Sequence, residues 1–156
     1  MANELDVGDP APDFALPTDD GGQARLADFK GKAVVLYFYP KDDTSGCTAE
    51  AIAFSGLKPK FEAAGAAVVG VSPDSAASHD KFKKKHDLAV ALAADPERAA
   101  IEAYGVWKEK SMYGRKYFGV ERSTFLIDRK GRIAKIWRKV KVPGHAEEVL
   151  AAAKAL

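Results

Sequence analysis

The chain has 156 residues, of which 47% are hydrophobic and 29% charged, and its 24 lysines and arginines nearly balance 22 acidic residues to give a net charge of +2. This length predicts one domain, residues 1–156, with a hydrophobic core that needs no disulfide or metal. The composition excludes a disordered chain, the small net charge argues against a nucleic-acid partner, and the single cysteine excludes a disulfide framework or a cysteine-rich zinc site.

The first part of the chain predicts a β extension followed by a buried strand. Within residues 7–32, several prolines and the stretch Asp19-Asp20-Gly21-Gly22 predict short extended pieces joined by a hairpin turn. Residues 33–39 are a continuous run of apolar, β-branched and aromatic side chains, which is typical of a central strand buried on both faces. Pro40 ends this strand, and a polar loop follows at residues 41–46.

The next segments predict a helix and a second buried strand. Apolar side chains recur at helical spacing from Cys47 onward, Gly65 ends the helix, and Pro59 is expected to kink it. Residues 66–72 then predict a strand buried like the first. Ser72 is expected to cap the helix that follows.

The remainder of the chain predicts one further strand–helix pair, a hairpin and a last helix. Residues 88–94 are a third apolar run, and a short helix is expected over 95–104. A tight turn separates residues 123–127 from 132–137, which predicts an antiparallel hairpin. A last amphipathic helix is expected over 145–156.

This order of elements predicts an α/β protein. Strands that alternate with helices are usually parallel and covered by helices on both faces, whereas the C-terminal hairpin makes the sheet mixed. A thioredoxin-like fold with an N-terminal β extension has this order. We therefore expect a central mixed β-sheet flanked by helices.

Cys47 is the strongest candidate for chemistry. It follows a buried strand and a polar loop and opens a helix, where unpaired backbone N–H groups and the helix dipole favour a thiolate. The alternative is a small buried hydrophobic residue, which is the usual state of a lone free cysteine. Its position in the sequence supports both interpretations equally.

The residues around Cys47 favour reactivity. Pro40 and Thr44 precede it with the spacing Pro-x-x-x-Thr-x-x-Cys, and residues 37–50 as a whole resemble the peroxiredoxins, in particular the bacterioferritin comigratory protein (PrxQ) branch. The similarity continues in order along nearly the whole chain, at residues 70–75, 104–107, 112–114 and 122–128.

The resemblance implies roles for four residues and no metal or organic cofactor. Cys47 looks like the peroxidatic cysteine, whose thiolate attacks a peroxide oxygen. Thr44 resembles the hydroxyl that hydrogen-bonds thiolate and peroxide, Pro40 the shield of the sulfur, and Arg122 the guanidinium that contacts both. Without the resemblance, Arg122 is a surface arginine paired with Glu121 or another carboxylate, and Thr44 is a turn or N-cap residue.

The chain departs from many members of this branch because it lacks a second, resolving cysteine. Ile52 stands at one common position for it, and Phe82-Lys83-Lys84 stand at another. The resemblance therefore implies a one-cysteine member whose sulfenic acid is resolved by an external thiol: glutathione, a glutaredoxin, thioredoxin or a second copy of Cys47. A longer-lived sulfenic acid is also expected to be more open to over-oxidation.

The sequence thus predicts a thiol-dependent peroxidase that reduces hydrogen peroxide and organic hydroperoxides through Cys47. The alternative is a non-catalytic redox sensor or thiol-docking protein, which stops after one equivalent of peroxide. A chaperone-like binding protein is a third interpretation and needs an exposed apolar surface. The resemblance implies a monomer or weak homodimer. We expect a cytoplasmic protein with no membrane partner, because no apolar run reaches the roughly 20 residues of a membrane span and a lone cysteine suits a reducing compartment.

Several other polar residues have simpler interpretations. The lysines within residues 81–85 are expected on a solvated helix face, and Glu50 is expected to support the Cys47 loop through hydrogen bonds. Tyr113 and Tyr117 fall in a basic loop that lines the peroxide entrance or covers the sheet. Surface positions without metal-ligand spacing are expected for His79, His86 and His145.

Overall fold

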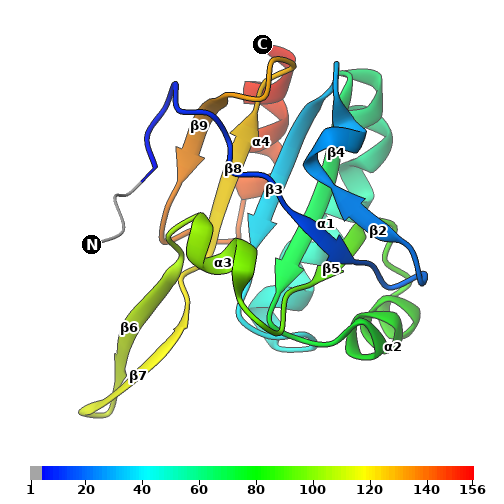
Figure 1. Ribbon diagram of the computed structural model, residues 1–156. Helices are drawn as coiled ribbons and strands as arrows, with labels where there is room; N and C mark the ends of the chain where they lie inside the picture. The colour runs from blue at the N-terminus through cyan, green and yellow to red at the C-terminus, as the bar shows by residue number, and fades with distance from the viewer. Residues whose placement is uncertain (1–4) are drawn as a thin grey trace.

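Five strands form the central sheet of the structure, a computed structural model that describes residues 5–156 (Figure 1). The outer strands β5 and β9 enclose β4, β3 and β8, where β3, β4 and β5 run parallel and β8 and β9 are antiparallel to their neighbours. The sheet is therefore mixed, as the order of elements predicts. Across the sheet the strands are β5 (Ala91–Ala94), β4 (Ala66–Ser72), β3 (Ala33–Phe38), β8 (Ser123–Ile127) and β9 (Ile133–Trp137).

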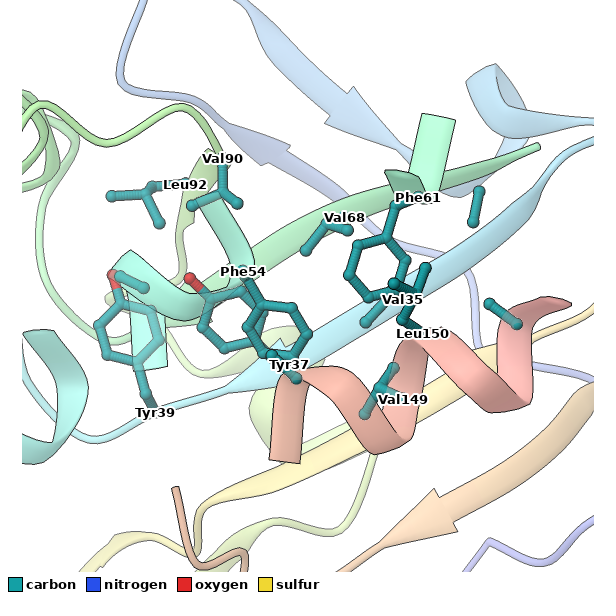
Figure 2. Close-up of a cluster of buried hydrophobic side chains, with 14 of the residues drawn as sticks. Val35, Tyr37, Tyr39, Phe54, Phe61, Val68, Val90, Leu92, Val149 and Leu150 are labelled. Carbon is teal, nitrogen blue, oxygen red and sulfur yellow. The ribbon is translucent and has the colours of Figure 1, made fainter. Parts of the chain in front are cut away.

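The central strand β3 is buried on both faces, because none of its residues is more than 1% exposed. Successive side chains of a strand point to opposite faces, so β3 supplies two separate clusters. Val35 and Tyr37 pack with side chains of α1 (Ser45–Ala63) and α4 (His145–Lys154), as Figure 2 shows. Val34, Leu36 and Phe38 of β3 instead pack on the opposite face, with α3 (Ala99–Ala103) and the N-terminal strands.

The N-terminal extension forms the predicted hairpin. β1 (Ala15–Pro17) pairs antiparallel with β2 (Gln23–Arg25), and the short 3-10 helix η1 (Leu26–Phe29) leads into the central strand. The buried side chains of this hairpin, Leu16 and Ala24, cover one face of the sheet. Within the described part of the chain, no helix is long and apolar enough to cross a membrane.

Helix α2 (Ala76–His86) begins later than the predicted cap at Ser72. Ser72 is still the last residue of β4, where its backbone pairs with β5 and its hydroxyl donates to Asp74 Oδ2 at 2.7 Å. The N-cap is instead Ser75, whose Oγ accepts the Ser78 N–H at 3.1 Å. The prediction at Ser72 is wrong because the ladder with β5 holds that residue in the sheet.

Helix α3 (Ala99–Ala103) is shorter than the predicted 95–104. Asp95 lies outside the helix, and its carboxylate accepts the N–H groups of Ala99 and Ile101, both at 2.9 Å. Arg98 takes a left-handed conformation (φ 63°) directly before the helix. The Asp95 side chain therefore caps α3 from four residues before its first residue, and Asp95 does not itself begin the helix.

The segment interpreted as a basic loop is a second hairpin. β6 (Trp107–Met112) pairs antiparallel with β7 (Arg115–Val120), and Tyr113 and Gly114 form the two-residue turn with positive φ angles of 52° and 78°. Two residues of positive φ match the twist of the flanking strands. The hairpin extends away from the body of the protein (Figure 1), so its strands lack the apolar alternation that reveals a buried strand.

Candidate active site

Cys47 lies in the first turn of α1, directly after the loop that leaves the buried strand β3. α1 begins at Ser45, and its N-cap Thr44 has an extended backbone (φ −89°, ψ 156°). The cysteine side chain is only 1% exposed, so it is both a buried residue and a residue at a helix N-terminus. Unpaired N–H groups and the positive end of the helix dipole favour negative charge on sulfur there.

Arg122 contacts both Cys47 and an acidic residue one turn further along α1. It donates from Nη2 to Cys47 Sγ at 3.3 Å and from Nη1 to Glu50 Oε1 at 2.7 Å. Residues three apart lie on the same side of a helix, which lets one guanidinium reach both. The paired carboxylate is thus Glu50 and not Glu121, and the arginine is partly buried instead of lying on the surface.

Glu50 is the acidic residue that orients this arginine. Burial raises the pKa of Glu50 to about 7, and the charge and hydrogen bond of Arg122 oppose that rise. Burial also acts against the charge of Arg122, but Glu50 and Cys47 together raise the pKa of the guanidinium. Arg122 therefore stays cationic beside the sulfur. The Glu50 Oε2 atom is buried and has no hydrogen-bond partner among residues 5–156, so Arg122 is what holds this carboxylate.

Thr44 and Pro40 lie on the loop that precedes the cysteine. The Thr44 hydroxyl donates to the Lys41 carbonyl at 2.9 Å, and the Thr44 carbonyl accepts the first helical N–H from Thr48 at 2.8 Å. Its backbone place is therefore that of an N-cap, although its side chain closes the loop instead of capping the helix. Pro40 is partly buried two residues after the end of β3. The peroxide-binding role of Thr44 and the shielding role of Pro40 stay predictions.

A buried polar group fixes this loop to α2. The Asp42 carboxylate accepts from the Tyr39 hydroxyl at 2.6 Å and from the Ser78 hydroxyl at 2.7 Å, and it lies 2.7 Å from Nδ1 of His79. Burial acts against the charge of Asp42, but the hydrogen bonds from His79 and Tyr39 keep its pKa below the ordinary value. The other ring nitrogen of His79 lies 3.0 Å from the Ala93 carbonyl. The polar groups of this cluster thus find their partners on different elements.

The surface positions expected for the histidines are wrong for His79 and His145, which are buried. His145 begins α4, and its Nε2 lies 2.8 Å from the Thr124 hydroxyl of β8. Burial and the nearby charge of Arg122 lower the pKa of His145 against the opposing effect of its acidic neighbours. The spacing of residues in the sequence did not reveal that these two histidines are buried, because the groups that hydrogen-bond them lie in distant segments of the chain.

Within residues 5–156, one group of side chains has metal-ligand spacing. Ligand atoms of Asp42, Asp74 and His79 lie within 4.8 Å of one another. These atoms already hydrogen-bond inside the protein, since Asp74 Oδ2 accepts the Asp42 N–H at 2.8 Å as well as the Ser72 hydroxyl. The group therefore serves to hold the loop in place.

A second aspartate fixes the loop to the end of α2. Asp43 has a left-handed backbone (φ 61°) and accepts from Lys85 Nζ at 2.6 Å. Its other oxygen lies 2.8 Å from Nε2 of His86. Hydrogen bonds from His86 and Lys85 lower the pKa of Asp43. The two aspartates together attach the loop to both ends of α2.

Comparison with known proteins shows which chains this sequence is similar to. The sequence model of the AhpC/TSA family matches residues 7–136. Peroxiredoxin Bcp of Bacillus subtilis is 51% identical over 146 residues, which cover 94% of this chain and 93% of that protein. Peroxiredoxin Bcp of Escherichia coli is 40% identical over 148 residues, which cover 95% of each protein.

Solved structures agree with the fold over nearly the whole chain. A cysteine-to-serine mutant of PrxQ from Xylella fastidiosa is 43% identical, covers 98% of both chains and superposes with a TM-score of 0.93. A structure of the bacterioferritin comigratory protein of Xanthomonas campestris, described in connection with the alkyl peroxide reduction activity of that protein, is 48% identical and has a TM-score of 0.87. It covers 91% of this chain and 90% of its own.

Proposed function

Because the chain belongs to the AhpC/TSA family, and within it to the Bcp/PrxQ peroxiredoxins, which are thiol-dependent peroxidases, we propose that Cys47 is its peroxidatic cysteine. The observation that carries the proposal is the 3.3 Å contact between Arg122 Nη2 and Cys47 Sγ at the start of α1. A guanidinium and a helix N-terminus both favour a thiolate. This setting suits a nucleophilic sulfur.

The thiolate attacks the terminal oxygen of a hydroperoxide, ROOH. The S–O bond forms as the O–O bond breaks, sulfur is oxidised by two electrons, and Cys47 becomes a sulfenic acid. The leaving RO⁻ takes up a proton and departs as ROH, which is water when the substrate is hydrogen peroxide. The alkyl peroxide activity described for the Xanthomonas campestris relative supports organic hydroperoxides as further substrates.

Arg122 stabilises the charge that moves during this step. Negative charge passes from sulfur toward the leaving oxygen, and a fixed donor beside both atoms lowers the energy of the transition state more than that of the ground state. Glu50 is the positioning residue that holds the guanidinium in place. Thr44 is proposed to donate to the peroxide after its hydroxyl turns from the Lys41 carbonyl, and Pro40 to shield the sulfur from water.

An external thiol is proposed to return Cys47 to its reduced form, because the chain has one cysteine. A thiol R′SH attacks the sulfenic sulfur, forms a mixed disulfide and releases water. A second R′SH then attacks the mixed disulfide, which releases R′SSR′ and restores the Cys47 thiol. Glutathione, a glutaredoxin and thioredoxin are the candidate reductants. Since the cysteine is 1% exposed, the first turn of α1 must open to admit any of them.

Stopped-flow measurement of hydrogen peroxide consumption by the reduced protein tests the proposal, with Cys47→Ser as the control. We expect a rate constant orders of magnitude above that of free cysteine, which is lost in the variant. Added thiol is expected to support many turnovers, whereas a redox sensor stops after one equivalent. A rate no faster than free cysteine, or one that survives in the variant, would contradict the proposal.

A further inference from the structure

One guanidinium serves two groups at the start of α1 that are both anionic when ionised. Arg122 Nη1 donates to Glu50 Oε1 at 2.7 Å, and Nη2 of the same side chain donates to Cys47 Sγ at 3.3 Å. Cys47 and Glu50 are each only 1% exposed, so water does little to screen their charges. A thiolate and a carboxylate therefore compete for a single positive charge in a buried site.

The surroundings of Glu50 offer its carboxylate no second cation. Arg122 is the only ion-pair and hydrogen-bond partner that the described part of the chain gives it, and its Oε2 atom is buried without a partner there. Tyr37 of β3, which packs against α1, is uncharged, because burial raises the pKa of its hydroxyl well above the ordinary value. Lys110 of β6 and His145 of α4 interact electrostatically with Arg122 but are not hydrogen-bonded to Glu50 in the described structure. An ionised Glu50 thus keeps one oxygen that no donor of these residues reaches, which is costly for a buried charge.

The sulfur has a source of stabilisation that the carboxylate lacks. Cys47 lies in the first turn of α1, where unpaired N–H groups and the helix dipole favour a thiolate, whereas Glu50 lies one turn further along the helix. With one cation for two anions, the proton is expected on the group with the poorer environment, which is Glu50. Burial raises the pKa of Glu50 to about 7 against the effect of Arg122, in agreement with these contacts.

We propose that Glu50, besides positioning Arg122, holds a proton while Cys47 is a thiolate and releases it when peroxide oxidises the sulfur; this deepens the proposed peroxidase function and rests on it. A thiolate draws the positive charge of the guanidinium to itself and leaves Glu50 neutral. A sulfenic acid is uncharged, so the charge of Arg122 becomes available to the carboxylate, which ionises. One negative charge thus lies beside Arg122 before and after the reaction.

Protons and electrons balance in this step. The reactants are the Cys47 thiolate, protonated Glu50 and ROOH, and the products are the Cys47 sulfenic acid, the Glu50 carboxylate and ROH. The S–O bond forms as the O–O bond breaks, and sulfur loses two electrons. The proton that RO⁻ gains is matched by the proton that Glu50 loses, so the reaction takes up none from the solvent. Without this carboxyl group, each oxidation draws one proton from the solvent.

Proton uptake during a single oxidation tests the proposal. The variant is Glu50→Gln, because glutamine keeps the size and an oxygen acceptor for Arg122 but cannot ionise. Reduced protein is mixed with one equivalent of hydrogen peroxide in weakly buffered solution with a pH indicator, and the signal is read after all Cys47 has reacted. At pH ~6, we expect almost no uptake by the wild type and about one proton per cysteine by Glu50→Gln. At pH ~8, where Glu50 is ionised in both states, the wild type is also expected to take up about one proton.

Two further measurements sharpen the test. Glu62→Gln is the matched control, because it removes an exposed carboxylate from the same helix, and it is expected to repeat the wild-type proton uptake. Infrared difference spectra give a readout that needs no variant. The carbonyl band of a protonated carboxylic acid is expected to disappear from the wild-type protein on oxidation at pH ~6.

Three outcomes would overturn the proposal. They are equal proton uptake by wild type and Glu50→Gln at pH ~6, a carboxylic acid band that persists after oxidation, and ultraviolet absorbance showing that wild-type Cys47 is still a thiol at this pH. A role of Glu50 in positioning alone would change the rate constant but not the number of protons taken up. Failure of the wild type to consume hydrogen peroxide would instead contradict the peroxidase function itself.

Discussion

Arg122, which follows the β6–β7 hairpin along the chain, contacts Cys47, yet the hairpin and the loop that carries Cys47 are held by different interactions. Asp42 attaches the loop to α2 through buried and partly buried hydrogen bonds, and Asp43 does so through an exposed one. The hairpin strands pair with each other, and Tyr113 at their turn is 100% exposed. Buried polar networks specify one geometry because every unpaired member is costly, whereas an exposed hairpin tolerates change. Changes near the loop should therefore affect chemistry and stability, and changes at the hairpin tip should affect neither strongly.

The largest effect is expected from Arg122→Met. The variant loses the donor to the Cys47 sulfur and leaves Glu50 buried without its cation. We expect the rate constant for hydrogen peroxide to fall about 1000-fold, the upper range for removal of a transition-state donor. Stopped-flow oxidation measures this rate constant. Arg122→Lys is a companion variant that keeps the positive charge but loses the paired donors of the guanidinium. A rate within twofold of the wild type would show that the site does not use the guanidinium.

His79→Ala tests the buried brace of the loop. The change removes the contacts of the imidazole with Asp42 and the Ala93 carbonyl and leaves a cavity. We expect the free energy of unfolding to fall by about 3 kcal/mol, as for other broken buried pairs. Urea unfolding measures the loss. The control is Lys84→Ala, which removes an exposed helix ion pair with Asp80 and should cost less than about 0.5 kcal/mol.

Glu50→Gln tests the buried carboxylate through pH. The folded protein holds the Glu50 proton with a pKa of about 7, above the ordinary 4.5, so it binds more protons than the unfolded chain between these values. This group therefore makes the folded state less stable as pH rises toward 7. Between pH ~5.5 and pH ~8, the free energy of unfolding of Glu50→Gln is therefore expected to rise by about 2 kcal/mol relative to that of the wild type.

Urea unfolding at several pH values gives this difference directly. Glu62→Gln, an exposed position on the same helix, provides the control, since no comparable change with pH is expected there. Parallel curves for wild type and Glu50→Gln would mean that the buried carboxylate does not take up a proton in this range.

Tyr113→Ser should have the smallest effect and sharpens the contrast between the two regions. The side chain is fully exposed at the turn, away from any buried contact. We expect a change in unfolding free energy within about 0.5 kcal/mol and a peroxide rate within twofold of the wild type. Urea unfolding and stopped flow measure both. A large loss of rate would show that the tip takes part in the site.

Local patterns predicted most of the fold because they report burial. The continuous apolar run at residues 33–39 predicted a strand buried on both faces, and β3 has that environment. Helical spacing from Cys47 and the glycine-rich turn near residue 21 likewise predicted α1 and the N-terminal hairpin. The strands of the β6–β7 hairpin could not be predicted in this way, because strands exposed to water on both faces carry polar residues without alternation.

The sequence by itself determined the order of elements, the place of Cys47 at the start of a helix and the resemblance to the peroxiredoxins. Only the tertiary structure decided which groups meet there. Glu50 and Arg122 are 72 residues apart, and Asp42 and His79 are 37 apart. The physical reason is that apolar side chains must be buried and so leave a periodic pattern, whereas a polar side chain is satisfied equally by water or by a distant partner. Only the tertiary structure decides whether such a polar side chain hydrogen-bonds to water or to a distant residue.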